Sequence, residues 1–169
     1  AAALKHPCGD IELRHVEFHY VPGRPVLRDV SVKIPAGAKA AIVGETGSGK
    51  TTMINLLTRF YDVSSGSILL DGRDLRDYRM EDLREAFGVV LQDTSLFAVS
   101  VRDNICYGHP EASMEQVREA AQTVGADSFI ERLPDGYDTV LEQGGMELSQ
   151  GERQLITIAR AVLANAQIL

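Results

Sequence analysis

The chain has 169 residues, of which 44% are hydrophobic and 24% are charged, the composition of an ordinary globular domain. Its net charge of −7 and its lack of a basic tract argue against a nucleic-acid-binding protein and against a basic helix on a membrane surface. No run of apolar residues approaches the roughly 18 that a membrane-spanning helix needs. Cys8 and Cys106 lie far apart in the sequence and lack the spacing of a metal-binding pair.

The first 34 residues predict an antiparallel sheet. Apolar residues alternate with polar ones over 10–20, but the parity changes midway, which predicts a bulged strand or two short strands. A turn over 21–25 and a second alternating run over 26–34 follow. Tyr20 has two interpretations on these grounds alone, because a tyrosine at a strand end can be a core residue or a platform for an adenine ring.

The stretch from Gly44 to Thr51 fits the pattern G-x-x-x-x-G-K-[ST] of a phosphate-binding loop. The apolar run 40–43 predicts a buried strand before it, and residues 51–60 predict a helix after it. Backbone N–H groups of the loop and the helix N-terminus would then converge on a phosphate. A glycine-rich turn that binds nothing is the alternative, and the strand–loop–helix order argues against it.

Two side chains of this loop have specific expected roles. Lys50 would neutralise the terminal phosphates, and the Thr51 hydroxyl would bind Mg²⁺. The glycines allow the left-handed backbone conformations that a tight loop needs. The predicted nucleotide-binding residues of the loop are Gly44, Glu45, Thr46, Gly47, Ser48, Gly49, Lys50, Thr51 and Thr52.

The middle of the chain predicts a further pair of strands and a short helix. A strand over 67–70 runs into the hairpin-type turn Asp71-Gly72, and residues 78–87 predict a helix. The apolar run 88–91 predicts a second buried strand, parallel to the strand before the loop. Gln92 follows directly, at the strand end where α/β sheets bind ligands, so it could reach Mg²⁺ or an attacking water; on position alone a surface residue is more common.

The C-terminal half predicts mostly helices, with Ser100, Ser113 and Asp127 as plausible N-caps. The sequence 148–152 opens a long helix that extends to about Asn165, and it contains the S-x-x-E pattern of a capping box. A well-capped helix explains this stretch fully. A second anion site explains it equally well, because a serine hydroxyl and a glycine N–H at a helix N-terminus can bind phosphate.

Taken together, these motifs resemble the nucleotide-binding domain of an ABC transporter, of the exporter type, over residues 9–169. Tyr20 matches the adenine-stacking position, Gly44–Thr51 matches Walker A, and Gln92 matches the glutamine of the Q-loop. Residues 59–66 and Asp71-Gly72 match the exporter pattern, with Val63 in place of the usual proline, and residues 93–104 resemble the surface that meets the transmembrane coupling helices. The family signature falls on Leu148, Ser149, Gln150, Gly151 and Glu152.

The resemblance implies an α/β fold: a P-loop NTPase core with an antiparallel β subdomain and an α-helical subdomain, incomplete at the C-terminus. Residues 1–92 would form the β subdomain and the P-loop core. Residues 93–165 would form the mainly helical subdomain with the signature helix, and 166–169 would begin the Walker B strand.

The resemblance also implies a mechanism. Two such domains pair head to tail, as a homodimer or a heterodimer, and sandwich ATP and Mg²⁺ between Walker A of one and the signature of the other. Lys50, Thr51 and Gln92 would act in cis, with Lys50 and Gln92 in catalysis and Thr51 and Gln92 on the metal, whereas the signature would act on the partner's ATP. Hydrolysis would drive export through transmembrane helices, with this domain, itself soluble, at the cytoplasmic face of a membrane.

Several residues depart from the family pattern. Gln150 and Glu152 replace a glycine and a glutamine of the signature, and Gln143 stands where exporters usually have a glutamate. The sequence ends at Leu169, before the Walker B aspartate, the glutamate that serves as general base and the switch histidine. Glu45 is a poor substitute for that base. The alternative is therefore a nucleotide-binding fragment without hydrolysis, whereas an unrelated P-loop kinase or GTPase explains neither Tyr20 nor 148–152.

Overall fold

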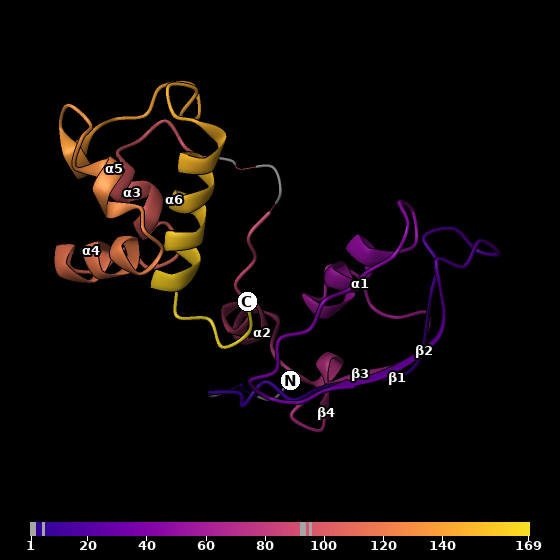
Figure 1. Cartoon of the computed structure of the whole chain (residues 1–169). Helices are drawn as coiled ribbons and strands as arrows, with labels where there is room; N and C mark the ends of the chain where they lie inside the picture. Colours follow the sequence, from indigo (N-terminus) through magenta and orange to yellow (C-terminus); the bar gives the residue numbers. More distant parts are fainter. Residues whose placement is uncertain (1–2, 5, 92–93, 95) are drawn as a thin grey trace. The chain divides into compact units, whose positions relative to one another are not determined.

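The N-terminal strands pair in an antiparallel sheet in the computed structural model, which describes residues 3–4, 6–91, 94 and 96–169. The described strands are β1 (Ile11–Phe18), β2 (Leu27–Ile34), β3 (Ser65–Leu70) and β4 (Arg73–Asp74), in the order β2-β1-β3-β4 (Figure 1). The register between β1 and β2 shifts between Leu13 and Val16, which confirms the bulge that the change of parity predicted. The turn Asp71-Gly72 joins β3 to β4, also as predicted.

One face of this sheet packs against helices from the same unit, Ala1–Phe87 together with Ile168. The helices are α1 (Lys50–Leu57), the 3-10 turn η1 (Leu75–Asp77) and α2 (Met80–Ala86). Alternate strand residues point into the core because successive side chains of a strand face opposite sides. The buried residues of this core are Ile11, Leu13, Val16, Phe18, Leu27, Leu56, Leu57, Ile68, Leu70, Leu75, Tyr78 and Leu83.

Two predicted strands are wrong. Residues 40–43 form no strand and are exposed, with Val43 at 88% exposure, and residues 88–91 form no strand either. The only pairing near the second run, within the described residues, is an isolated parallel bridge between Phe87 and Ile168. A strand exists only where a neighbour takes up its N–H and C=O groups, and no described segment does so for these two runs.

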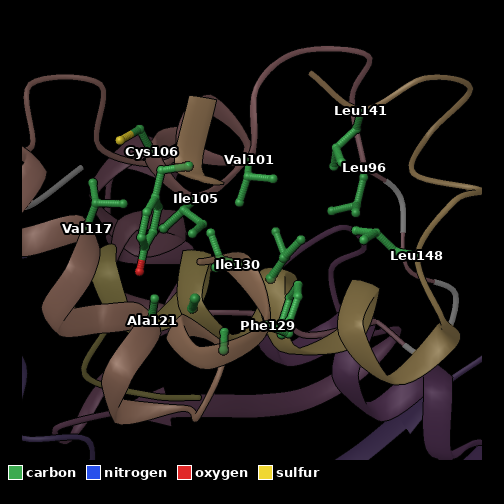
Figure 2. Close-up of a cluster of buried hydrophobic side chains, with 14 of the residues drawn as sticks. Leu96, Val101, Ile105, Cys106, Val117, Ala121, Phe129, Ile130, Leu141 and Leu148 are labelled. Atoms are coloured by element: carbon green, nitrogen blue, oxygen red, sulfur yellow. The ribbon is translucent and has the colours of Figure 1, made fainter. Parts of the chain in front are cut away.

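The second unit, Gly88–Gln167 with Leu169, is helical. Its described elements are α3 (Val101–Cys106), α4 (Met114–Thr123), α5 (Asp127–Ile130), the turn η2 (Gly136–Asp138) and α6 (Gln150–Leu163). Figure 2 shows their shared core, in which α3, α4 and α5 contribute side chains such as Ile105, Val117 and Phe129. None of the helices in the described part of the chain is long and apolar enough to cross a membrane.

Of the three N-caps predicted before residue 148, two are confirmed. Ser100 and Ser113 cap α3 and α4, each accepting a backbone N–H of the first turn through its hydroxyl. Asp127 does not cap α5, because Ala126 holds the cap position and the Asp127 carboxylate accepts the hydroxyl of Tyr137 instead.

Candidate functional site

The loop before α1 closes tightly through its glycines. Ser48 N–H donates to the carbonyl of Glu45 at 3.1 Å, and Gly49 enters the helix with a φ of +94°. A Cβ on Gly49 would lie 2.8 Å from a methyl group of Leu27 on β2, so a larger residue would displace that side chain and would also strain the left-handed backbone. The start of α1 therefore lies close to β2, and no side chain caps the first N–H groups of the helix.

The side chain of Lys50 folds back over this loop. Its ammonium donates to the carbonyls of Gly44 and Glu45, at 2.7 Å in each case. Thr51 is exposed, whereas Thr52 is buried. The structure thus brings the charge of Lys50 and the hydroxyl of Thr51 to the same helix terminus, where an anion would compete with the two carbonyls for the ammonium.

Tyr20 lies beside the same helix in a cluster of aromatic rings. Its hydroxyl is 3.1 Å from the Thr52 hydroxyl. Its ring packs perpendicular to Phe18, with centroids 4.8 Å apart, and perpendicular to Tyr61, with centroids 5.2 Å apart. Tyr20 is 49% exposed, so the ring keeps surface on which a base can stack. Tyr61 was not predicted as a site residue. The only indication in the sequence was that it lies in the segment 59–66, which matches the exporter pattern.

The second predicted anion site is a capping box, as the sequence predicted. The Ser149 hydroxyl accepts from Glu152 N–H at 3.3 Å, and the Glu152 carboxylate accepts from both the Ser149 N–H and the Ser149 hydroxyl at 2.9 Å. These bonds, the backbone one first, hold the pKa of Glu152 below its usual value, so the group is a carboxylate at neutral pH. The hydroxyl proton of Ser149 is therefore already engaged.

The other residues of the predicted signature differ in how far they are exposed. Leu148 is buried in the helical core, whereas Gln150 and Gly151 are exposed. Apart from the backbone of its own helix turn and its chain neighbours, no described heavy atom lies within 4 Å of a Cβ built on Gly151, so no other segment covers the backbone there. Gln92 lies outside the described residues.

Comparison with known proteins decides the family. A family profile described as "ABC transporter" matches residues 27–169. The chain belongs to the ABC transporter family. It is 49% identical over 166 residues to a fatty acid ABC transporter ATP-binding/permease protein of Mycobacterium bovis, covering 98% of this chain and 26% of that protein. It is 50% identical to an ATP-dependent lipid A-core flippase of Syntrophus aciditrophicus, covering 94% and 26%.

A solved structure agrees with these relatives. A bacterial Atm1-family ABC exporter with ATP bound superposes with a TM-score of 0.93 at 41% identity, covering 98% of this chain and 29% of that one. The resemblance and the α/β fold class predicted from sequence are confirmed, and the chain is an ABC transporter ATP-binding domain homologous to those of exporters. It spans about a quarter of the length of the curated relatives that it matches.

The capping box of this ABC transporter domain gives a first prediction. Replacing Glu152 with alanine should lower the free energy of unfolding by about 0.5–1 kcal/mol, because two hydrogen bonds to Ser149 are lost. Glutamine at the same position should retain most of that stability, since Gln116 closes the equivalent box with Ser113 on α4. Thermal unfolding of the two variants measures the difference. Equal losses for alanine and glutamine would contradict a capping role.

Proposed function

We propose that this ABC transporter domain binds Mg-ATP, and that the protein containing it hydrolyses ATP to drive export. The observation that carries the proposal is the loop 44–49 at the start of α1, where the Lys50 ammonium lies 2.7 Å from the Gly44 and Glu45 carbonyls. A phosphate at this helix terminus would receive the loop N–H groups and replace the carbonyls as the partner of Lys50. The relatives named as a flippase and an Atm1-family exporter support transport.

In cis, each site residue has a separate role in this proposal. Tyr20 stacks on the adenine, the backbone of 44–52 binds the phosphates, and Lys50 neutralises the terminal phosphates. Thr51 and Gln92 bind Mg²⁺, and Gln92 also orients the attacking water. Hydrolysis is phosphoryl transfer to water, governed by positioning and charge neutralisation. We assign no residue of 1–169 as the general base, so the 169-residue chain by itself should bind ATP without turning it over.

In trans, the signature acts on the ATP of a second nucleotide-binding domain, paired head to tail. Ser149 and Gly151 supply the hydroxyl and the N–H for the γ-phosphate, and Glu152 must release the Ser149 hydroxyl before that contact can form. We assign 1–92 to the β subdomain with the P-loop core, 93–165 to the helical subdomain and 166–169 to the start of the Walker B strand. Residues 93–104 meet transmembrane coupling helices at the cytoplasmic face of a membrane.

Replacing Lys50 with alanine tests the proposal. We expect the dissociation constant of Mg-ATP to rise at least about tenfold, because a charge-assisted contact to phosphate is lost. Calorimetry measures binding, and phosphate release by the whole protein, which should stop, measures turnover. Lys39→Ala is the matched control, because Lys39 is an exposed lysine in the segment before the loop. Unchanged ATP affinity in Lys50→Ala, or equal losses in both variants, would overturn the assignment.

A further inference from the structure

Three segments of the first unit hold the ring of Tyr20. Phe18, on β1, is 4% exposed and packs edge to face with the ring at an interplanar angle of 87°. Thr52, in the first turn of α1, places its hydroxyl 3.1 Å from the Tyr20 hydroxyl. Tyr61, which follows α1, packs at 88° with a centroid separation of 5.2 Å. Tyr20 thus has contacts from a strand, a helix and the segment after that helix.

These contacts constrain the ring in different ways. The hydroxyl oxygen of a tyrosine lies on the axis that runs from Cβ through the ring. A hydrogen bond to Thr52 therefore fixes the direction of that axis but leaves the ring free to rotate about it. Perpendicular neighbours oppose that rotation, because the ring edges and faces attract only in particular orientations. Phe18 and Tyr61 are those neighbours, and they also contact each other, with centroids 5.7 Å apart.

We propose that Tyr61 is a positioning residue for the nucleotide base, acting through Tyr20. This inference rests on the proposed function, in which Tyr20 stacks on the adenine. Phe18 is part of the buried core, whereas Tyr61 is 48% exposed, so the core does not require its ring in the way that it requires Phe18. Tyr61 restricts the ring of Tyr20 to one orientation, so that less ordering of the ring is left to the binding of the base.

The role predicts a selective loss. Without the ring of Tyr61, binding of the base must itself order Tyr20, so affinity for ATP falls. Binding of the phosphates to the loop 44–49 does not involve Tyr20 and stays the same. Inorganic tripolyphosphate carries the phosphates without a base, and it therefore separates the two contributions.

The experiment compares Tyr61→Leu, Tyr61→Phe and the native protein, in the whole protein that contains this chain, by calorimetry with Mg-ATP and with Mg-tripolyphosphate. We expect Tyr61→Leu to weaken Mg-ATP about two- to tenfold, the factor that corresponds to one perpendicular aromatic pair, and to leave tripolyphosphate unchanged. Tyr61→Phe keeps the ring and should bind both ligands normally. Phe60→Leu is the matched control, because it removes a neighbouring exposed aromatic ring that packs on another partner. The Phe60 ring is 63% exposed and lies 5.3 Å from the guanidinium of Arg84.

The other outcomes are decisive too. Equal weakening of both ligands in Tyr61→Leu would mean a general structural effect and would overturn the proposal, as would unchanged ATP affinity. Tyr61→Met, which fills the space with a flexible apolar chain, replaces the leucine variant if that variant fails to fold, with the same expected selectivity. Lys50→Ala should weaken both ligands. If it weakens neither, the proposed function fails, whatever Tyr61 does.

Discussion

Replacing Gly66 with alanine is expected to lower the free energy of unfolding by about 3–5 kcal/mol. A Cβ at this position would lie 2.2 Å from the carbonyl oxygen of His15 and 2.4 Å from that of Arg14, both on β1. These are backbone atoms, so no side chain can rotate away to make room. The φ of Gly66 is +79°, which adds the strain of a left-handed conformation for any residue with a Cβ.

Gly72→Ala is the matched control for this experiment. Gly72 also has a φ of +79°, but a Cβ there would have no described heavy atom within 4 Å. Its cost should be only the conformational strain, about 1–2 kcal/mol. Denaturant or thermal unfolding of both variants separates the close approach from the strain. Similar losses in the two variants would show that the contact between β1 and β3 does not depend on glycine.

Gly66 illustrates what the sequence could not specify. The change of parity in 10–20 is local, so the bulge in β1 could be predicted from it. The bulge in β1 contacts β3, which lies about fifty residues further along the chain. The register between these two strands shifts between Arg14 and Glu17. Nothing in the residues around Gly66 indicates that contact, and the sequence placed Gly66 only at the end of the segment 59–66 that matches the exporter pattern.

The candidate nucleotide site shows the same contrast between local contacts and contacts with distant segments. The loop 44–51 and the capping box of Ser149 and Glu152 are local structures, in which the residues that bond are within a few positions of each other, and their patterns were sufficient. The strands expected at 40–43 and 88–91 need hydrogen-bond partners from distant segments. An apolar run indicates a tendency to be buried, but it does not say which segment will pair with it.

The prediction for Asp127 was wrong and the contact of Tyr61 was missed, in each case because the partner lies outside the local segment. Asp127 is a residue type that is common at N-caps, but its carboxylate accepts a hydrogen bond from the Tyr137 hydroxyl instead. Tyr61 was part of a recognised segment, but its contact with Tyr20 depends on how the end of α1 meets β1. Sequence patterns therefore identify residues that act through neighbours in the chain more reliably than residues that act through packing.

Replacing Asn104 with alanine should destabilise the helical unit by about 3–5 kcal/mol. Asn104 is completely buried on α3. Its carbonyl oxygen accepts from Phe97 N–H at 2.8 Å, and its amide nitrogen donates to the carbonyls of Phe97 at 3.0 Å and of Ser100 at 3.1 Å. Alanine would leave the Phe97 N–H without this partner and would leave a space where the buried amide was, and both are costly. The carbonyls of Phe97 and Ser100 would keep the backbone N–H groups of Val99 and of residue 104. Arg102→Ala, at an exposed position on the same helix, should change stability by less than about 0.5 kcal/mol.

Asn104 also contacts Arg160 on α6, so a double-mutant cycle can measure how much of the stability comes from that contact. Arg160 donates to the Asn104 side-chain oxygen at 3.2 Å and to its backbone carbonyl at 2.8 Å, and its guanidinium lies 5.5 Å from the ring centroids of both Phe97 and Tyr107. Arg160→Ala and Asn104→Ala should therefore not add: the double variant should be less destabilised than the sum of the two by about 0.5–3 kcal/mol. Unfolding midpoints of the four proteins in this cycle measure that coupling. Strict additivity would mean that the contact between Arg160 and the Asn104 side-chain oxygen adds nothing to the packing of α3 against α6, because the bond from Arg160 to the Asn104 backbone carbonyl remains in Asn104→Ala.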